Sequence, residues 1–577
     1  MTTPAPTSGM TAPATTPATT PATGASWWTS AVVYQVYPRS FADSDGDGIG
    51  DLGGIRSKLD YLAELGVDAV WLSPVYPSPQ HDNGYDISDY QDIEPVFGSL
   101  AEFDLLLVEA HERGIKIVMD LVVNHTSDEH AWFQESRSSL TNPKRDWYWW
   151  RKPQADGGPP NGWGSAFSGP AWTLDPATDE YYLHLFAKQQ PDLNWENPEV
   201  REAVYAMMNW WLDRGVDGFR MDVINFIAKQ VELIDGPAPA TGGGSPMGAQ
   251  IHEFLQEMHR EVFDGRGGRH LTVGEMPGVS TDDALLFTDP ARREVDMIFQ
   301  FEHVGLDQGE HKFEVLPRSL TALKKSLSRW QEGLAETGWN SLYLNNHDQP
   351  RLVSRFGNDT SLRYESATLW ALVLHLHRGT PYIYQGEEIG MTNVRFDSID
   401  DYRDLESLNH YREAVEEFDL DPGTVLAGVQ TMGRDNARTP MQWDASPQAG
   451  FSAGTPWLAV NPNSVTVNVA ADLASERSVF RFYQRLIALR HESEVVALGD
   501  FTLLEPDHDA LYAFTRSRGD ETLLVVANAS DAPFTDLLPM DVSGADLILA
   551  NYPATTDAAA PSSNPVLRPW EARLYRL

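Results

Sequence analysis

The 577-residue sequence contains no cysteine. It can therefore form no disulfide, no thiolate zinc site and no cysteine nucleophile. The sequence also lacks an uninterrupted apolar run near the ~20 residues that a membrane span needs. The fold must be stabilised by its own core, helped at most by an oxygen-ligated ion, and we expect no membrane partner.

Basic residues are scarce: 43 Lys and Arg stand against 83 Asp and Glu, a formal net charge of −40. A field of this sign repels nucleic acid and anionic lipid, so we expect neither as a partner. Residues 1–26 are rich in Thr, Ala and Pro and lack the basic start and apolar core of a signal peptide. We interpret them as a disordered low-complexity tail, and we expect a cytoplasmic protein that is monomeric or weakly self-associating.

Strand-like and helix-like segments alternate through most of the chain. The apolar segments with strand character are 32–37, 69–72, 115–122, 215–221, 270–275, 297–301, 340–345 and 381–384. Helical segments stand between them, and a periodic helix near 478–490 follows the last. Eight βα units predict a (β/α)8 TIM barrel of the α/β class.

Two regions interrupt or follow this alternation. Residues 126–197 are rich in Trp, Gly and Pro, and they are too many for a simple loop. We expect an inserted domain there, after the third strand. Residues 500–577 contain only strand-like segments and predict a C-terminal antiparallel β-sandwich domain. The barrel is then expected to comprise residues 27–125 and 198–499.

Carboxylates follow four of the predicted strands. The third strand contains Asp120, the fourth ends at Arg220 and Asp222, the fifth ends at Glu275, and the seventh leads to Asp348. Active sites of such barrels lie at the carboxyl ends of their strands. One such residue is usually a helix cap or a surface charge, but four arriving at the same rim predict an active site.

Arg220 and Asp222 are two residues apart in a strand and therefore share one face. A lone pair of this kind is usually structural, but in this setting the guanidinium should lower the pKa of Asp222, as a carboxylate nucleophile requires. Crowded carboxylates tend to keep one of their number protonated. We therefore predict retaining glycoside hydrolysis, with Asp222 attacking the sugar, Glu275 as acid and base, and Asp348 orienting the ring.

Several motifs resemble a known family. The segments DLVVNHT from Asp120, GFRMD from Gly218, GEM from Gly274 and NHD from Asn346 are similar to the four signature regions of the α-amylase family, glycoside hydrolase family 13. QPDLN at 190–194, NGYDI at 83–87, GTPYIYQGEE at 379–388 and RDNARTP at 434–440 resemble its oligo-1,6-glucosidase subgroup. The resemblance covers residues 27–577. It implies a barrel with an inserted domain and a C-terminal β-domain, and no organic cofactor.

The resemblance also implies roles for individual residues. Asp222, Glu275 and Asp348 match the nucleophile, the acid/base and the transition-state stabiliser. The residues that match sugar contacts are His125, Arg220, His347, Asp82, Arg434, Tyr85 and Phe167. Asp82 and Arg434 would close the pocket at the non-reducing end, giving an exo-acting enzyme that releases single glucose units from a small oligosaccharide. Arg438 lies in the same motif as Arg434 and stays open as the alternative, just as Asp82 could be a turn residue and Phe167 a core residue.

Val223 follows the matched nucleophile. In the resembling subgroup, Val at this position goes with α-1,6 bonds, and Thr or Ala goes with α-1,4 bonds. A branched apolar side chain there narrows the floor of the acceptor site, although a methyl-sized difference is worth only ~1–3 kcal/mol. We therefore predict that isomaltose is hydrolysed faster than maltose.

The loop that begins at Asp43 alternates carboxylates with glycines, which can surround a hard cation with oxygen ligands. It resembles the start of an EF-hand, but position 12 is Gly54 rather than Glu. In the resembling glucosidases such a loop binds one structural Ca²⁺. The matching ligands are Asp43, Asp45, Asp47, the Ile49 carbonyl and Asp51. The alternative is a solvated acidic turn.

Other functions on this scaffold stay open. A transglucosylase or sucrose isomerase would use a sugar in place of water as acceptor, but residues 349–355 have the glucosidase-like form QPRLVSR. An α-1,4-preferring α-glucosidase differs only in linkage. An inactive sugar-binding homologue would lose catalytic carboxylates, whereas this chain keeps all three.

Overall fold

The computed structural model describes residues 26–229, 247–267, 270–553 and 566–577. The predicted low-complexity tail, residues 1–26, lies outside this part of the chain except for Ser26.

Eight parallel strands form the barrel. They are β1 (Val33–Val36), β2 (Ala69–Leu72), β3 (Lys116–Val122), β7 (Gly218–Asp222), β8 (Leu271–Glu275), β9 (Met297–Phe299), β10 (Ser341–Leu342) and β11 (Thr380–Tyr384). Their order in the sheet is β10-β11-β1-β2-β3-β7-β8-β9. A parallel bridge between Ile298 and Asn340 joins the two edges and closes the ring. The predicted TIM barrel is therefore confirmed.

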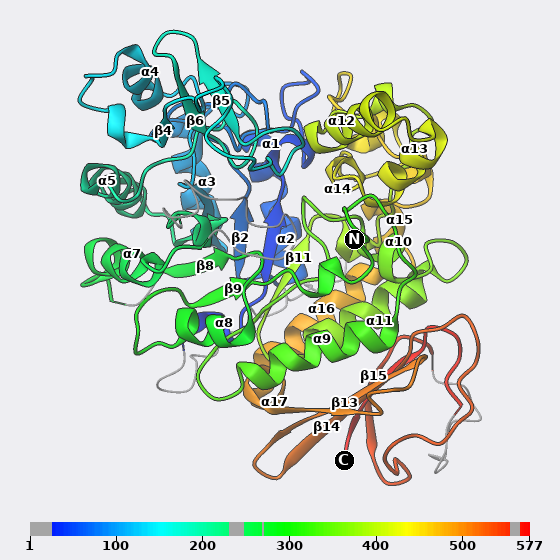
Figure 1. Cartoon of the computed structure of the whole chain (residues 1–577). Coiled ribbons are helices and arrows are strands. Elements are labelled where there is room, and N and C mark those ends of the chain that lie inside the picture. Colours follow the sequence, from blue (N-terminus) through cyan, green and yellow to red (C-terminus); the bar gives the residue numbers. More distant parts are fainter. Residues whose placement is uncertain (1–25, 230–246, 268–269, 554–565) are drawn as a thin grey trace, which may run out of the picture.

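Helices surround the barrel (Figure 1). The main ones are α1 (Leu52–Ser57), α2 (Leu59–Leu65), α3 (Leu100–Glu112), α5 (Pro198–Arg214), α7 (Ile251–Met258), α8 (Thr281–Thr288), α9 (Leu320–Gly333), α10 (Leu352–Phe356), α11 (Arg363–His375), α16 (Val479–Glu492) and α17 (Glu494–Leu498). Alternate strand residues such as Trp71, Val273 and Tyr382 fill the barrel interior, while the residues between them pack against the helices. Strands buried on both faces explain the near-continuous apolar runs in the sequence.

Two groups of elements lie above the carboxyl ends of the strands (Figure 1). Between β3 and α5 the chain forms α4 (Ala131–Ser138) and a small antiparallel sheet of β4 (Trp150–Arg151), β6 (Glu180–Leu183) and β5 (Trp172–Asp175). On the opposite side are α12 (Leu405–Arg412), α13 (Pro422–Met432) and α14 (Asp435–Arg438). The small sheet lies where the sequence predicts an insertion; its boundary residues stay a prediction.

The C-terminal part is antiparallel, as predicted. Its strands are β12 (Asp500–Leu504), β13 (Leu511–Arg518), β14 (Glu521–Asn528), β15 (Asp546–Ala550) and β16 (Ala572–Arg576), in the order β12-β13-β14-β16-β15. These described strands form a single sheet, orange to red in Figure 1. One face packs on the barrel helices, and Phe534, Leu538 and Val542 cover the other.

Two buried cations join this sheet to the barrel. Lys324 of α9 donates to the carbonyl oxygens of Glu505, His508 and Leu511 at 2.5–2.9 Å. In the opposite direction, Arg516 of β13 donates to carbonyls near the ends of two barrel helices, those of Leu376, Val496 and Gly499. Carbonyls at helix ends have no partner within the helix, so Arg516 caps them from the neighbouring sheet.

Across the described ranges, every helix is too short or too polar to cross a lipid bilayer.

Candidate active site

The predicted carboxylates meet around one arginine. Arg220, which is 1% exposed, contacts Asp120 at 2.8 Å and Asp222 at 2.7 Å through Nη1, and Glu275 at 2.7 Å through Nη2. Three neighbouring strands, β3, β7 and β8, deliver these groups to the same rim. The Arg220 guanidinium also lies 4.9 Å from the ring of Trp71, whose Nε1 donates to Asp120. The strand-end argument therefore placed these carboxylates correctly.

The pairing of Arg220 with Asp222 predicts a lowered pKa, and this prediction is wrong. Burial, the largest effect, raises the pKa of Asp222 well above its usual range, and Glu275 and Asp120 raise it further, against the lowering by Arg220. Burial likewise raises the pKa of Asp120 to about 6. One guanidinium cannot offset burial and the neighbouring carboxyl groups, so the pKa values of Asp120 and Asp222 both lie above the usual range.

Asp348 lies in a different electrostatic setting. Burial raises its pKa, but His347, Arg434 and Arg438 together hold the pKa well below the usual range. Arg438 Nη2 lies 2.7 Å and His347 Nε2 3.2 Å from the carboxylate. Burial in turn lowers the pKa of His347 to about 3. The pKa of Asp348 is therefore shifted in the opposite direction to that of Asp222, and Asp348 is ionised at neutral pH.

The inner end of the site is closed by an ion pair. Arg434 Nη2 lies 3.1 Å from Asp82 and 2.5 Å from Asp404, and its guanidinium is 4.9 Å from the ring of Phe167. Burial raises the pKa of Asp82 to about 6 despite Arg434. Arg434 lines the catalytic cavity, whereas Arg438 is 0% exposed and does not line it. This geometry favours Arg434 over Arg438 as the arginine that faces a ligand.

Tyr85 and His125 line the pocket, and the buried His347 contacts Tyr85. Tyr85 OH is 3.0 Å from Asp120 and 2.7 Å from His347 Nε2, and the two rings stack at 5.3 Å. His125 Nε2 lies 3.2 Å from both the Tyr85 carbonyl and Gln190 Nε2. Burial lowers the pKa of His125 to about 4, so it is neutral and available for hydrogen bonding.

The residue after Asp222 has an unusual backbone. Val223 has φ 34° and ψ 42°, a left-handed conformation that a β-branched side chain rarely adopts. Its N–H donates to Glu275 Oε2 at 3.1 Å, and its side chain lines the cavity. Such strain persists where the surroundings enforce it and is frequent at functional sites.

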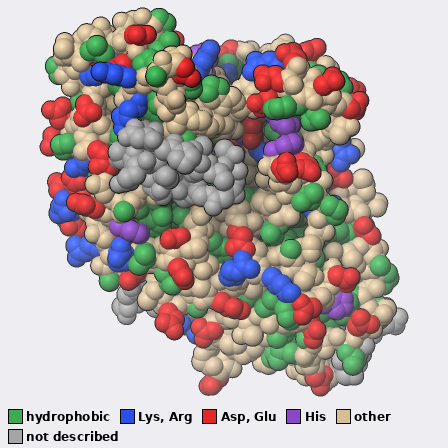
Figure 2. Space-filling view, in the orientation of Figure 1, with side chains coloured by type: hydrophobic (Ala, Val, Ile, Leu, Met, Phe, Trp, Pro, Cys, Tyr) green, Lys and Arg blue, Asp and Glu red, His purple; other side chains and the backbone are tan. Residues whose placement is uncertain are grey.

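Many of these groups line one cavity of about 450 Å³, whereas Arg220 and His347 lie buried behind its lining. It is lined by Asp82, Tyr85, His125, Phe167, Asp222, Val223, Glu275, Asp348 and Arg434, among others. Figure 2 shows the surface hollowed between the part that carries β4–β6 and the part that carries α12 and α13, with acidic side chains spread over the same face. Nearly every predicted substrate residue is thus brought to one pocket.

The comparisons agree with this geometry. Residues 35–499 match the family model described as the α-amylase catalytic domain. The chain belongs to the α-amylase family. It is 57% identical to the oligo-1,6-glucosidase of Parageobacillus thermoglucosidasius, over 96% of this chain and 99% of that one. It is 54% identical to the oligo-1,6-glucosidase of Bacillus cereus, with 96% and 99% covered. The solved trehalulose synthase from Pseudomonas mesoacidophila superposes with a TM-score of 0.91 at 42% identity, over 96% of this chain and 100% of that one.

Some pocket residues of this α-amylase family member escape sequence reasoning. Asp404 is 0% exposed and binds both Arg434 and Arg438. Lys312 and Glu406 form a 2.7 Å ion pair at the wall of the pocket. Asp404 caps the short helix α12 and Glu406 lies in its first turn, while Lys312 lies in a turn, so no strand end marks any of the three. The one hint in the sequence is that the two arginines of RDNARTP, if buried, need a carboxylate partner such as Asp404.

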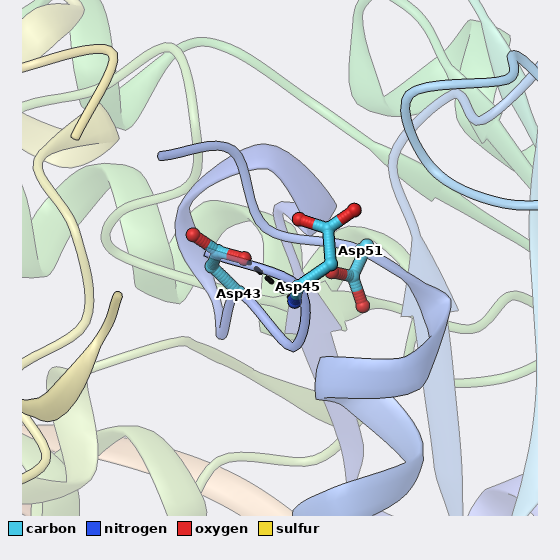
Figure 3. A group of neighbouring side chains, drawn as sticks. All are labelled: Asp43, Asp45 and Asp51. Atoms are coloured by element: carbon cyan, nitrogen blue, oxygen red, sulfur yellow. Dashed lines mark hydrogen bonds between the residues drawn. The ribbon is translucent and has the colours of Figure 1, made fainter. Parts of the chain in front are cut away.

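The acidic loop lies away from this pocket. Figure 3 shows the side chains of Asp43, Asp45 and Asp51 in one loop. One carboxylate oxygen of each lies within 4.8 Å of the others. Asp43 accepts from the N–H groups of Asp45, Gly46 and Gly48, and Asp51 caps α1 through the Gly54 N–H. Asp47 instead accepts from Ile49. A hard cation fits this all-oxygen donor set.

Proposed function

We propose that this protein is a retaining, exo-acting α-glucosidase that releases glucose from the non-reducing end of short oligosaccharides. The main support is that the guanidinium of Arg220 contacts both Asp222 and Glu275. Two carboxyl groups that bind the same guanidinium lie close together, and retaining glycosidases need such a close pair, ~5–5.5 Å apart. The high identity to two oligo-1,6-glucosidases over nearly the full length supports the same reaction.

The two carboxyl groups divide the chemistry. Asp222 attacks the anomeric carbon and forms a glucosyl–enzyme ester, while Glu275 gives its proton to the departing glucosidic oxygen. Glu275 then takes a proton from water, which breaks the ester and releases glucose with its original anomeric configuration. Asp348, ionised by its cationic neighbours, stabilises the positive charge that develops on the sugar ring.

We infer the exo action from the closed inner end of the pocket, which limits cleavage to the terminal glucose. Asp82 and Arg434 form the end wall, and their polar atoms match hydroxyl groups of one terminal glucose. Phe167, Tyr85, His125 and His347 surround the ring. A longer chain cannot extend past the Asp82–Arg434 pair, so only terminal units are cleaved.

We propose that α-1,6 bonds are preferred. Val223 lines the cavity at its floor, beside the carboxylate that protonates the leaving oxygen. The names of the two relatives, oligo-1,6-glucosidases, support the same preference.

The test is hydrolysis of isomaltose, maltose, sucrose and panose, with the anomer of the first glucose released followed by NMR. We expect α-glucose, fastest from isomaltose, and a loss on the order of a thousandfold or more in Asp222→Asn and in Glu275→Gln. Asp213→Asn, on the exposed end of α5, is the matched control. Near-normal turnover in either catalytic variant, or release of β-glucose, would refute the assignment.

We also propose that the acidic loop holds one structural Ca²⁺. Asp43, Asp45 and Asp51 would supply carboxylate oxygens, with Asp47 and the Ile49 carbonyl completing the set. Burial and the neighbouring carboxylates raise the pKa of Asp47 despite its bond to Ile49, which reflects like-charge crowding that a cation relieves. The ion would stabilise the loop and takes no part in the reaction.

A further inference from the structure

Gln35 is a buried polar side chain that the proposed reaction does not use. It lies on β1 two residues after Val33, which belongs to the barrel interior, so both side chains face inward. Gln35 is 1% exposed, and its Nε2 lies 2.8 Å from His347 Nδ1 and 3.2 Å from Ser73 Oγ. The amide therefore contacts the ring nitrogen of His347 that does not contact Asp348.

The His347 ring is held in a fixed plane. It stacks on Tyr85 at 5.3 Å and 8°, and on Tyr37 at 6.1 Å and 21°. Burial lowers the pKa of His347 to about 3, so the imidazole is neutral at neutral pH and carries one proton. Stacking fixes the plane of the ring but not the nitrogen that holds this proton, so the hydrogen-bond partners must decide it.

The partners of Nε2 require the proton to be on that nitrogen. The ionised Asp348 carboxylate, which can only accept, lies 3.2 Å from Nε2. A bare Nε2 would place its lone pair against the carboxylate oxygen, which is repulsive. Tyr85 OH is 2.7 Å from Nε2 and 3.0 Å from Asp120 Oδ2. With the proton on Nε2, the Tyr85 oxygen accepts from His347, and its own hydrogen is free to donate to Asp120.

A proton on Nε2 leaves Nδ1 as an acceptor that needs a donor. The Gln35 amide nitrogen supplies it at 2.8 Å, whereas the reversed amide would set two acceptors face to face. The hydrogen bonds then run in one direction, from Gln35 through His347 and Tyr85 to the carboxylate of the third strand. That carboxylate, Asp120, in turn binds Arg220, the guanidinium at the centre of the active site.

We propose that Gln35 is a positioning residue that, together with Asp348, keeps the proton of the His347 imidazole on Nε2 and holds the ring toward the active site. Its effect on turnover rests on the proposed function, whereas the place of the proton does not. The hydrogen bond at one ring nitrogen of a histidine decides which nitrogen is protonated. Where such partners support metal-ligating histidines, their loss typically costs ~10–100-fold in affinity or activity. We expect an effect of similar size here.

The position of the proton is measured by NMR of the unaltered protein with isotopically labelled histidine nitrogens. The His347 signals are identified as those that are missing in His347→Asn. At neutral pH we expect one protonated nitrogen, Nε2, and one bare, hydrogen-bonded nitrogen, Nδ1. A proton on Nδ1, or on both nitrogens, would overturn the proposal. This measurement needs neither activity nor a variant of Gln35.

Gln35→Met keeps the length of the side chain and removes the donor. We expect kcat/KM for isomaltose to fall ~10–100-fold, and the Nδ1 signal of His347 to shift because its hydrogen bond is lost. Gln331→Met is the matched control, since Gln331 is 3% exposed on α9 and its amide bonds to the backbone of Arg378. This control should lose stability to a similar extent but keep kcat/KM within about twofold and leave the His347 signals unchanged.

A fall of less than about twofold in a folded Gln35→Met would contradict the proposal, and so would an equal fall in Gln331→Met. If Gln35→Met does not fold, the proton position in the unaltered protein decides. An unaltered protein that fails to hydrolyse isomaltose would instead overturn the proposed function, so the two failures are distinguishable.

Discussion

The N–H of Val223 donates to Oε2 of Glu275 from a left-handed backbone conformation. Val223, which lines the cavity, thus also holds the carboxylate of the proposed acid/base in place. We expect the Val223 side chain to influence which glucosidic bond is cleaved by shaping the pocket, and the Val223 backbone to influence cleavage through its hydrogen bond to Glu275. Substitutions at this position should therefore keep a β-branched side chain if only the floor of the pocket is to change.

Val223→Thr meets that condition, since it replaces one methyl group by a hydroxyl. We expect the isomaltose-to-maltose ratio of kcat/KM to fall roughly tenfold, because a polar group on the floor favours the alternative acceptor orientation by ~1–2 kcal/mol. Ile224→Val, at the buried neighbouring position, serves as the control and should leave the ratio unchanged. A ratio that does not move in Val223→Thr would contradict the assigned role.

Arg434→Lys should mainly weaken substrate binding, whereas Arg438→Lys should mainly lower the stability of the fold. Arg434 faces the cavity, so its lysine variant should raise KM about tenfold or more while the melting temperature changes little. Arg438 is fully buried against Asp348 and Asp404, so its lysine variant should lose roughly 1–3 kcal/mol of stability. Steady-state kinetics and thermal unfolding of both variants check this. The opposite pattern would make Arg438 the ligand-facing residue.

Glu387 should make stability fall as the pH rises. Burial raises its pKa to about 8, against the hydrogen bond from Tyr483. The pKa of Glu387 is near 4.5 in the unfolded chain and near 8 in the folded protein, so between these pH values the folded protein binds more protons than the unfolded chain. The contribution of Glu387 to stability is therefore present at pH 4.5 and is lost by about pH 8.

Glu387→Gln keeps the acceptor for Tyr483 and removes the titration. We expect this variant to be more stable than the unaltered protein by roughly 1–3 kcal/mol at pH 8.5 and nearly equal to it at pH 4.5. Denaturant unfolding at several pH values measures the difference. Glu112→Gln, on the exposed face of α3, is the control. Parallel pH curves for Glu387→Gln and the unaltered protein would rule out a raised pKa.

Removal of Ca²⁺ should lower the melting temperature. A ligand at a hundredfold excess over its Kd stabilises the folded state by ~2.7 kcal/mol, and chelation removes that term. Asp43→Asn keeps the oxygen that accepts from Asp45 and Gly46 but loses the one that accepts from Gly48, and it weakens the donor set. Its melting temperature should therefore start lower and respond little to chelator. The exposed Asp89→Asn is the control and should respond as the unaltered protein does. No bound metal and no effect of chelator would favour a solvated turn.

Local sequence patterns explain how much could be predicted. Apolar strands placed Asp120, Asp222 and Glu275 at one rim because parallel strands end at the same edge of the barrel. The resemblance supplied Asp82, Tyr85 and Arg434, which lie in loops and have no periodic signal. The sequence therefore predicts which residues come together in the site when each of them lies at a strand end or in a known motif.

The charge state of Asp222 could not be predicted in the same way. Its pKa depends on burial and on Glu275, 53 residues along the chain, as much as on its neighbour Arg220. Lys312, Glu406 and Asp404 escape for a related reason. The turn that carries Lys312 and the start of helix α12 lie far apart in the chain, and only the fold brings them together. Sequence patterns predict the positions of groups better than the balance of charges between them.

Lys324 and Arg516 have a consequence for unfolding. Each cation completes hydrogen bonds in the unit to which it does not belong: Lys324 those of the loop before β13, and Arg516 those of barrel helix ends. Separating sheet from barrel would leave both sets of carbonyls without donors. The two units should therefore lose structure together, in one cooperative calorimetric transition, although they have separate hydrophobic layers.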